Sequence, residues 1–259
     1  MTKQCWICGA PAVTREHKFK KTDVARAGGE WAFEERPFFL GKDKFSRIPA
    51  PDSKLVKFGK VLCQHCNCAG TQRYDKAYDQ FLEWVSTSSR NAMSLDRIDF
   101  EAIYGAVWQE GVLCLLKYFL KHFGCVLSDR GYTIPLDLTD LFDRNDTAPF
   151  FVSFARNSHW FKFERSGNGP LGNFPMLGML SESTGLVHQP YISGVLIGCL
   201  DIIYGYGDLD SYSWEGARIS APCKSVSLGL YNQNAGHPHI IAGFPPQPRE
   251  FTIGHKVYL

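Results

Sequence analysis

The sequence predicts an α+β fold, in which an N-terminal ββα unit with an insertion precedes a C-terminal α+β domain built of a helix followed by mostly β-strands. Three observations lead to this prediction. Two Cys-x-x-Cys pairs bracket the N-terminal unit, a helical periodicity follows the second pair, and short β-type runs fill the chain after Gly131. A stretch rich in Ser and Thr marks the boundary, which we place so that the domains cover residues 1–90 and 91–259.

The N-terminal elements follow from local patterns. Gly9 closes a tight turn after the first Cys-x-x-Cys pair, and the segment 12–17 is typical of a short strand. Residues 22–58 are broken by Gly and Pro and are expected to be an insertion, with a second strand over 54–62. Apolar residues then recur at spacings of three and four, which predicts a helix over about 66–85 with one buried face: Tyr74, Ala77, Tyr78, Phe81, Leu82 and Val85.

The C-terminal domain begins with a helix. Residues 101–125 are apolar almost all round, which predicts a buried helix that is broken or kinked near Gly111. Runs rich in aromatic and β-branched residues predict strands over 150–154, 159–163, 194–200 and 251–253. We expect this domain to bind the target, to dimerise or to dock a partner protein.

Composition sets the class of protein. A chain of 259 residues with 44% hydrophobic and 14% aromatic residues can bury a sizeable core and is not disordered. It has no run of 18 apolar residues and no apolar segment behind Met1, so we expect neither a membrane span nor a secretory signal. Nine cysteines in such a chain are expected to be metal ligands and buried thiols rather than disulfides, and the expected location is the cytoplasm.

Charge is distributed unevenly along the chain. Residues 1–90 hold 16 Lys and Arg against 10 Asp and Glu, whereas residues 91–259 hold 12 against 16, so the net charges are +6 and −4. A basic N-terminal domain favours a polyanionic partner such as nucleic acid. The alternative is that these lysines only solvate the surface of a metal-binding unit.

The two Cys-x-x-Cys pairs predict a metal site. Each pair places two thiolates on one turn, and two pairs complete a closed tetrahedral Zn²⁺ site with no position left for water, as in structural zinc sites. Roughly 50 residues separate the pairs, more than in a plain zinc ribbon. The predicted ligands are Cys5, Cys8, Cys63 and Cys66, and most of the remaining cysteines are expected to be buried thiols: Cys68, Cys114, Cys125, Cys199 and Cys223.

An acid–His pair and an Asn lie beside these cysteines. Glu16-His17 follows the first pair, and Asn67 follows Cys66 directly. Taken alone, Glu16-His17 is a common surface dipeptide and Asn67 a favoured helix cap. The order Cys-x-x-Cys, Glu-His, Cys-x-x-Cys-Asn is much more specific than either part.

This order resembles the HNH (ββα-metal, His-Me finger) endonucleases, in the subgroup stabilised by a four-cysteine zinc, over about residues 5–85. The resemblance implies that the four cysteines hold structural zinc and that His17 is the general base. Glu16, usually Asp in the family, would bind a catalytic ion, and Asn67 would complete its site.

The chemistry of phosphodiester hydrolysis agrees with these roles. A neutral imidazole near pH 7 can take a proton from the attacking water, and a cation stabilises charge on the phosphate oxygens. One carboxylate and one amide oxygen form a sparse site, which suits Mg²⁺ or Mn²⁺. The expected phosphate contacts are Lys18, Lys20, Lys21 and Arg73.

The sequence departs from the family in two places. The family's middle Asn has no counterpart, because Phe58-Gly59 fall roughly where it would lie. The family's last His also has no match, but Asp75 follows Asn67 by about two helical turns and either reaches the ion or is a solvated acid.

We therefore expect an HNH endonuclease that cuts DNA and acts in phage defence or restriction, with a partner protein such as an ATPase or as a homo-oligomer. This setting rests on analogy. Two alternatives stay open: a non-catalytic, zinc-organised module that binds nucleic acid or protein, and an HNH nuclease that cuts RNA.

Overall fold

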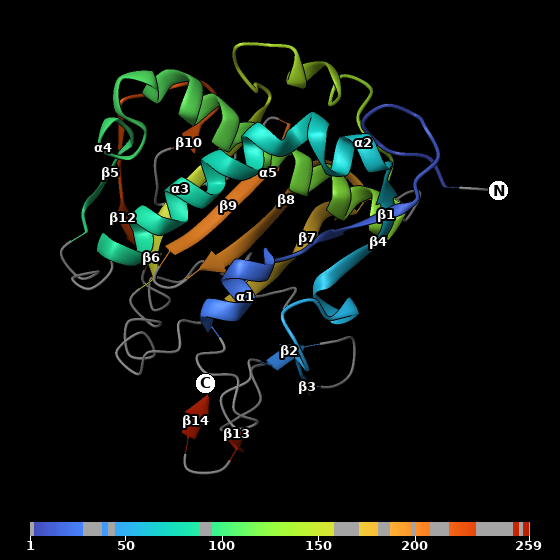
Figure 1. The fold of residues 1–259 in the computed structure, drawn as a ribbon, viewed down its shortest axis with the longest axis horizontal. Helices are drawn as coiled ribbons and strands as arrows, with labels where there is room; N and C mark the ends of the chain where they lie inside the picture. Colours follow the sequence, from blue (N-terminus) through green and yellow to red (C-terminus); the bar gives the residue numbers. More distant parts are fainter. Residues whose placement is uncertain are drawn as a thin grey trace.

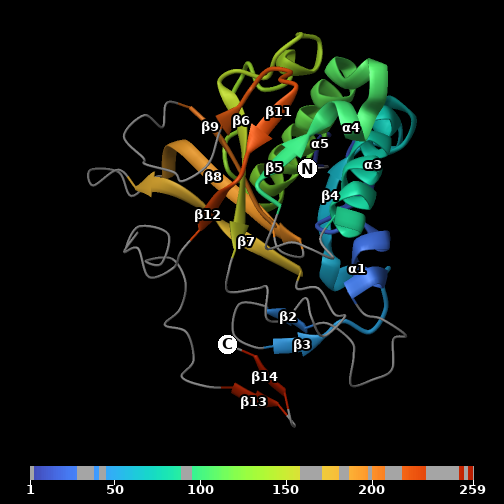
Figure 2. The same ribbon diagram turned by 90° about the vertical axis from the view of Figure 1, so that its left-hand side faces the viewer.

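The computed structural model describes residues 3–27, 38–40, 45–88, 95–157, 171–180, 187–197, 200–207, 218–231, 251–253 and 256–258. Helices and sheets both contribute, as the predicted α+β class requires. Figure 1 shows two helices, α3 (Gln72–Ser88) and α5 (Trp108–Arg130), crossing one face of a twisted sheet. The view in Figure 2 separates the layers: the sheet lies on one side of α5, and α3 lies on the other.

Helix α5 is the centre of the fold. Every residue from Cys114 to Ser128 is buried, because the helix packs on the sheet, on α3 and on strand β4 (Lys57–Leu62). The predicted buried helix is thereby confirmed. Among the residues described here, it is the one helical stretch long and apolar enough to cross a membrane, but 89% of its most apolar window is buried inside the fold, as in a core helix.

The break in this helical region lies earlier than predicted. Helix α4 (Phe100–Tyr104) ends at Gly105, whose φ of 64° is in the left-handed region that favours glycine, and a 3-10 turn leads into α5. Gly111 lies inside α5, and the ring of Tyr104 packs against it so closely that a Cβ would lie 2.3 Å from Cγ of the tyrosine. The helix is therefore broken at 105–107 and not at Gly111, which accommodates a neighbouring ring, while the alternative of a kink near Gly111 stays a prediction.

The N-terminal unit is an antiparallel strand pair followed by helices. Strand β1 (Thr14–His17) pairs antiparallel with β4 in an irregular register that sets His17 opposite Lys57. A short helix, α2 (Gln64–Asn67), and a 3-10 turn then lead into α3, whose buried residues are the six expected from periodicity. The predicted second strand begins later than expected, because Lys54–Val56 form a 3-10 turn.

The predicted insertion contributes two further pieces. Helix α1 (Lys21–Ala27) follows β1, and a small hairpin pairs β2 (Phe38–Leu40) with β3 (Phe45–Arg47). The ββα arrangement is therefore formed by β1, β4 and α3, with these pieces between its two strands.

Five strands of the main sheet follow the order β10-β6-β9-β8-β7, and all of their pairs are antiparallel. The sixth strand, β12, pairs parallel with β6. The strands of this sheet are β6 (Phe150–Asn157), β7 (Leu171–Leu180), β8 (Val187–Ile197), β9 (Leu200–Tyr206), β10 (Arg218–Ile219) and β12 (Gly229–Tyr231). Two smaller sheets pair β5 (Arg97–Asp99) with β11 (Ser225–Ser227) and β13 (Phe251–Ile253) with β14 (Lys256–Tyr258).

The strand predictions have mixed outcomes. Residues 150–154 lie within β6 and residues 251–253 form β13, so these two are confirmed. Residues 194–200 are not one strand, because β8 ends at Ile197 and pairs with Leu200 at the start of β9. An apolar run that continues through a hairpin cannot be told from a single strand by periodicity. The strand expected over 159–163 lies outside the described residues.

One hydrophobic core runs across the boundary proposed near residue 90. Trp6 packs on Phe142 with ring centroids 5.7 Å apart, and Phe81 of α3 packs on Phe154 of β6 at 5.5 Å. The division into 1–90 and 91–259 stays a prediction, but side chains from both parts share this core.

Candidate functional site

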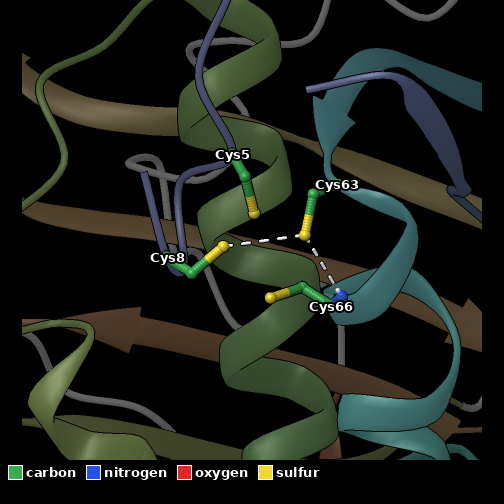
Figure 3. Close-up of side chains that lie close together, drawn as sticks. All are labelled: Cys5, Cys8, Cys63 and Cys66. Carbon is green, nitrogen blue, oxygen red and sulfur yellow. Dashed lines mark hydrogen bonds between the residues drawn. The ribbon is translucent and has the colours of Figure 1, made fainter. Parts of the chain in front are cut away.

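The four predicted ligands come together beside the start of β1 and the end of β4. The Sγ atoms of Cys5, Cys8, Cys63 and Cys66 all lie within 4.8 Å of one another and point toward a common centre (Figure 3). The backbone N–H of Cys66 donates to Sγ of Cys63 at 3.4 Å and helps to lower the pKa of that thiol to about 7. The four cysteines can therefore hold a metal ion.

Local structure explains how each pair is aimed. Gly9, with a φ of 72°, closes the first turn, and its N–H donates to the carbonyl of Cys5 at 2.9 Å. Cys63 precedes α2 as its N-cap residue, which carries Cys66 one turn further on. Trp6, between the first two ligands, donates its indole N–H to Sγ of Cys125 on α5 at 3.4 Å. The four-cysteine cluster is thereby attached to the core helix.

The other described cysteines differ in exposure. Cys114 and Cys125 are buried, as predicted, and Cys223 is partly buried. Cys68 follows α2 at the surface and is exposed, so it is an exception to the burial expected of most of these cysteines. Cys199 lies outside the described residues.

Asn67 connects the helix end to strand β1. Its side-chain Nδ2 donates to the backbone carbonyl of Arg15 at 3.4 Å, so the amide lies beside the peptide that leads into Glu16. Its Oδ1 is buried and has no hydrogen-bond partner among the described residues. A buried amide oxygen without a donor is costly, which makes this atom a candidate ligand for a cation.

Glu16 and Asp75 meet across a buried lysine. Nζ of Lys121 lies 3.0 Å from Oε2 of Glu16 and 3.3 Å from Oδ2 of Asp75, and the Lys121 side chain is only 2% exposed. Burial would lower the pKa of Lys121, but the two carboxylates hold it above its usual value. The predicted ion ligand and the uncertain Asp75 are thus brought together by an ammonium from α5.

His17 points to a different partner. Its Nε2 lies 3.2 Å from Oδ1 of Asp52, which also pairs with Lys57. Burial and the ammonium of Lys57 lower the pKa of His17 below its ordinary value, so the imidazole is neutral at pH 7. The three predicted catalytic side chains therefore make three separate contacts: Glu16 with Lys121, His17 with Asp52, and Asn67 with the carbonyl of Arg15.

A buried histidine, His122, holds the residue that follows His17 in the chain. Nε2 of His122 lies 2.9 Å from the carbonyl oxygen of Lys18, and its Nδ1 lies 2.7 Å from the hydroxyl of Tyr204 on β9. Burial lowers the pKa of His122 to about 4, so the ring is neutral. Because a carbonyl can only accept, Nε2 carries the proton and Nδ1 accepts from the tyrosine. This chain of bonds joins the main sheet to the residue after His17.

The four predicted phosphate contacts have different surroundings. Lys21 is exposed at the start of α1, and exposed Arg73 stacks over the ring of Tyr74. Lys20 pairs with Asp79 at 2.8 Å, which engages its charge within the protein. Lys18 is half-buried, and burial lowers the pKa of its ammonium.

Sequence reasoning missed three residues of this region: Asp52, Lys121 and His122. A signal was present for the last two, because a Lys-His pair inside an otherwise apolar helix must find partners when it is buried. The identity of those partners could not be read from the sequence. Asp52 lies in an irregular segment with no pattern that would mark it.

Comparison of the chain with protein-family models, with curated proteins and with solved structures found no match.

The donor atoms can be tested against the two expected ions. Four thiolates at mutual contact distance fit a closed tetrahedral site. The buried Oδ1 of Asn67 is a hard oxygen donor that fits Mg²⁺ or Mn²⁺, and so is the carboxylate of Glu16. That carboxylate is already neutralised by Lys121.

Proposed function

We propose that the chain is a metal-dependent HNH endonuclease that hydrolyses phosphodiester bonds in DNA. The observation that supports it most is the contact of Asn67 with β1 beside Glu16, which brings the Asn after the second Cys-x-x-Cys pair to the strand that carries the Glu-His pair. In this contact Asn67 lies beside the residue that precedes Glu16, as a shared ion site of Glu16 and Asn67 would require.

The four cysteines hold Zn²⁺ in this proposal. Thiolates are the ligands that zinc prefers in closed structural sites, and the ion stabilises the turn that presents α2 to β1. Its role is to hold the scaffold, because four protein ligands leave no position for water or substrate.

Glu16 and the Oδ1 of Asn67 hold the catalytic ion, Mg²⁺ or Mn²⁺, which would supply positive charge to the phosphate. His17 accepts the proton of the attacking water through its neutral imidazole, and Asp52 orients that ring. The exposed Lys21 and Arg73 are available to bind the DNA backbone. Lys18 and Lys20 add positive charge next to Glu16 and His17, although Lys20 is paired with Asp79.

A specific observation favours a second function. Lys121 already pairs with Glu16 and Asp75, as expected of a zinc-organised module that binds nucleic acid or protein and has lost catalysis. Cutting of RNA instead of DNA is a variant of the first proposal. Cytoplasmic action in phage defence or restriction, with an ATPase-like partner or as a homo-oligomer, remains an analogy-based extension of it.

Nicking of plasmid DNA by the wild-type chain and by His17→Ala, with and without Mg²⁺, tests the proposal. Cleavage that needs both the ion and His17 supports a nuclease, and intact plasmid under a range of divalent ions favours the binding module.

A further inference from the structure

The charged groups around Lys121 form one cluster. Nζ of Lys121 contacts Glu16 and both carboxylate oxygens of Asp75, while Lys20 contacts Asp79 at 2.8 Å and Asp75 at 4.0 Å. Three carboxylates therefore face two ammonium groups, and the cluster carries one excess negative charge. Removal of the Lys121 charge would leave two, which is the charge of one divalent cation.

The placement of Lys121 is specific. Its ammonium is 2% exposed and belongs to the core helix, whereas Glu16 and Asp75 come from β1 and α3. The neighbouring Lys117, one turn earlier on the same helix, is equally buried but donates to the backbone carbonyls of Phe142 and Arg144, both at 2.7 Å. Among the described residues, Lys121 has carboxylate oxygens at contact distance, whereas Lys117 donates to backbone carbonyls.

We infer that the ammonium of Lys121 and a divalent cation are alternative occupants of the Glu16–Asp75 site, so that helix α5 controls the binding of metal at Glu16. This inference rests on the proposed function only in calling that metal catalytic. It follows from electrostatics: two cations that share one carboxylate at contact distance repel each other strongly in a partly buried site.

The geometry also explains the cost of exchange. An ion bound to Oε2 of Glu16 would lie about 2.0–2.6 Å from that oxygen. The ammonium of Lys121 now takes this space, 3.0 Å from the same oxygen. Lys121 must withdraw for that to happen, but its helix is enclosed by the core, so the lysine has no ready path to water. Metal binding at Glu16 is therefore weakened by Lys121.

The test compares Lys121→Met with Lys117→Met and the wild type, as full zinc-loaded chains in buffer depleted of other metals without chelator. Thermal unfolding is followed during a Mn²⁺ titration, and Mn²⁺ binding is measured by calorimetry. Lys121→Met should unfold at a lower temperature without Mn²⁺, regain stability with it, and bind Mn²⁺ about tenfold or more tightly than the wild type. Lys117→Met should lose stability with no regain.

Two outcomes overturn the inference. One is that Lys121→Met binds Mn²⁺ no better than the wild type, and the other is that it fails to fold even with Mn²⁺ present, since the ion should then replace the ammonium. If Glu16 is the ligand, Mn²⁺ should not stabilise the double variant Glu16→Gln/Lys121→Met as it stabilises Lys121→Met. A chain that gains Mn²⁺ affinity in this way but cuts no nucleic acid would leave the inference standing and remove the proposed function.

Discussion

The indole ring of Trp6 lies directly against Gly124, where a Cβ would come within 2.4 Å of Cε2 and Cζ2 of the ring. Trp6 stands between two ligands of the four-cysteine centre, and Gly124 lies on α5 two residues after His122. One helix thus supports the four-cysteine cluster through Trp6, holds Glu16 through Lys121 and fixes the residue after His17 through His122.

Gly124→Ala should therefore destabilise the protein. The added methyl group has no room beside the Trp6 ring, and overpacking of a core costs about 1–3 kcal/mol in the free energy of unfolding. Denaturant unfolding checks this. In a double-mutant cycle, Gly124→Ala should cost little in a Trp6→Leu background, because the smaller side chain frees the space. Equal costs in both backgrounds would show that the contact carries no strain.

Loss of one thiolate should unfold the N-terminal unit. Cys63→Ser removes a ligand from the centre, and structural zinc contributes about 10–16 kcal/mol in small zinc domains. Metal analysis should find one zinc per chain in the wild type and none in this variant. Cys68→Ser is the matched control, because Cys68 is adjacent and exposed but outside the cluster. Full zinc content in Cys63→Ser would contradict the assignment.

Asn67→Ala should raise the Mg²⁺ concentration needed for half-maximal cleavage about tenfold or more. Residues that only support a metal ligand typically contribute about 10–100-fold to metal affinity, and a direct ligand should contribute no less. Stability should change by less than about 1 kcal/mol, since the variant loses one long hydrogen bond and one buried oxygen without a partner. Gln64→Ala, exposed on the same helix, should leave the Mg²⁺ dependence unchanged. The same Mg²⁺ dependence in both variants would exclude Asn67 as a ligand.

Much of this architecture could be predicted from the sequence, for identifiable reasons. The spacing of the cysteines fixed their convergence, and the spacing of Tyr74, Phe81 and Val85 gave the buried face of α3. The break at Gly105 was missed, because it depends on a backbone angle that no side-chain pattern records.

The partners in the site depended on tertiary packing. Lys121 reaches Asp75 across 46 residues of chain, and His122 reaches Lys18 across 104. Polar residues in an apolar helix indicate that partners exist, but the packing of α5 against β1 and α3 decides which they are. Asp52 was missed because it comes from an irregular segment beside β4.

His122 should make stability depend on pH. Its pKa of about 4 in the folded chain lies below the value of about 6.5 in the unfolded chain, so the unfolded state binds the proton first. Stability is then constant above pH 6.5 and falls by up to about 3 kcal/mol as the pH drops toward 4.

Unfolding at pH 7.5 and pH 4.5 measures this effect as a difference between variants, because protonation of the cysteine thiolates affects all of them alike. His122→Gln keeps an N–H for the carbonyl of Lys18 and does not titrate, so its stability should fall less than that of the wild type. The exposed His65→Gln should follow the wild type. Equal slopes for wild type and His122→Gln would show that His122 is not held neutral.

Cleavage of a supercoiled plasmid tests the nuclease proposal most directly. The zinc-loaded wild type should nick it with Mg²⁺ or Mn²⁺ and leave it intact without them. His17→Ala should be slower by about 100-fold or more, because the general base is lost, while His65→Ala, which alters an exposed imidazole on α2, should cut at the wild-type rate. Intact plasmid with every divalent ion, or equal cleavage by His17→Ala, would contradict the assignment of a nuclease site to Glu16, His17 and Asn67.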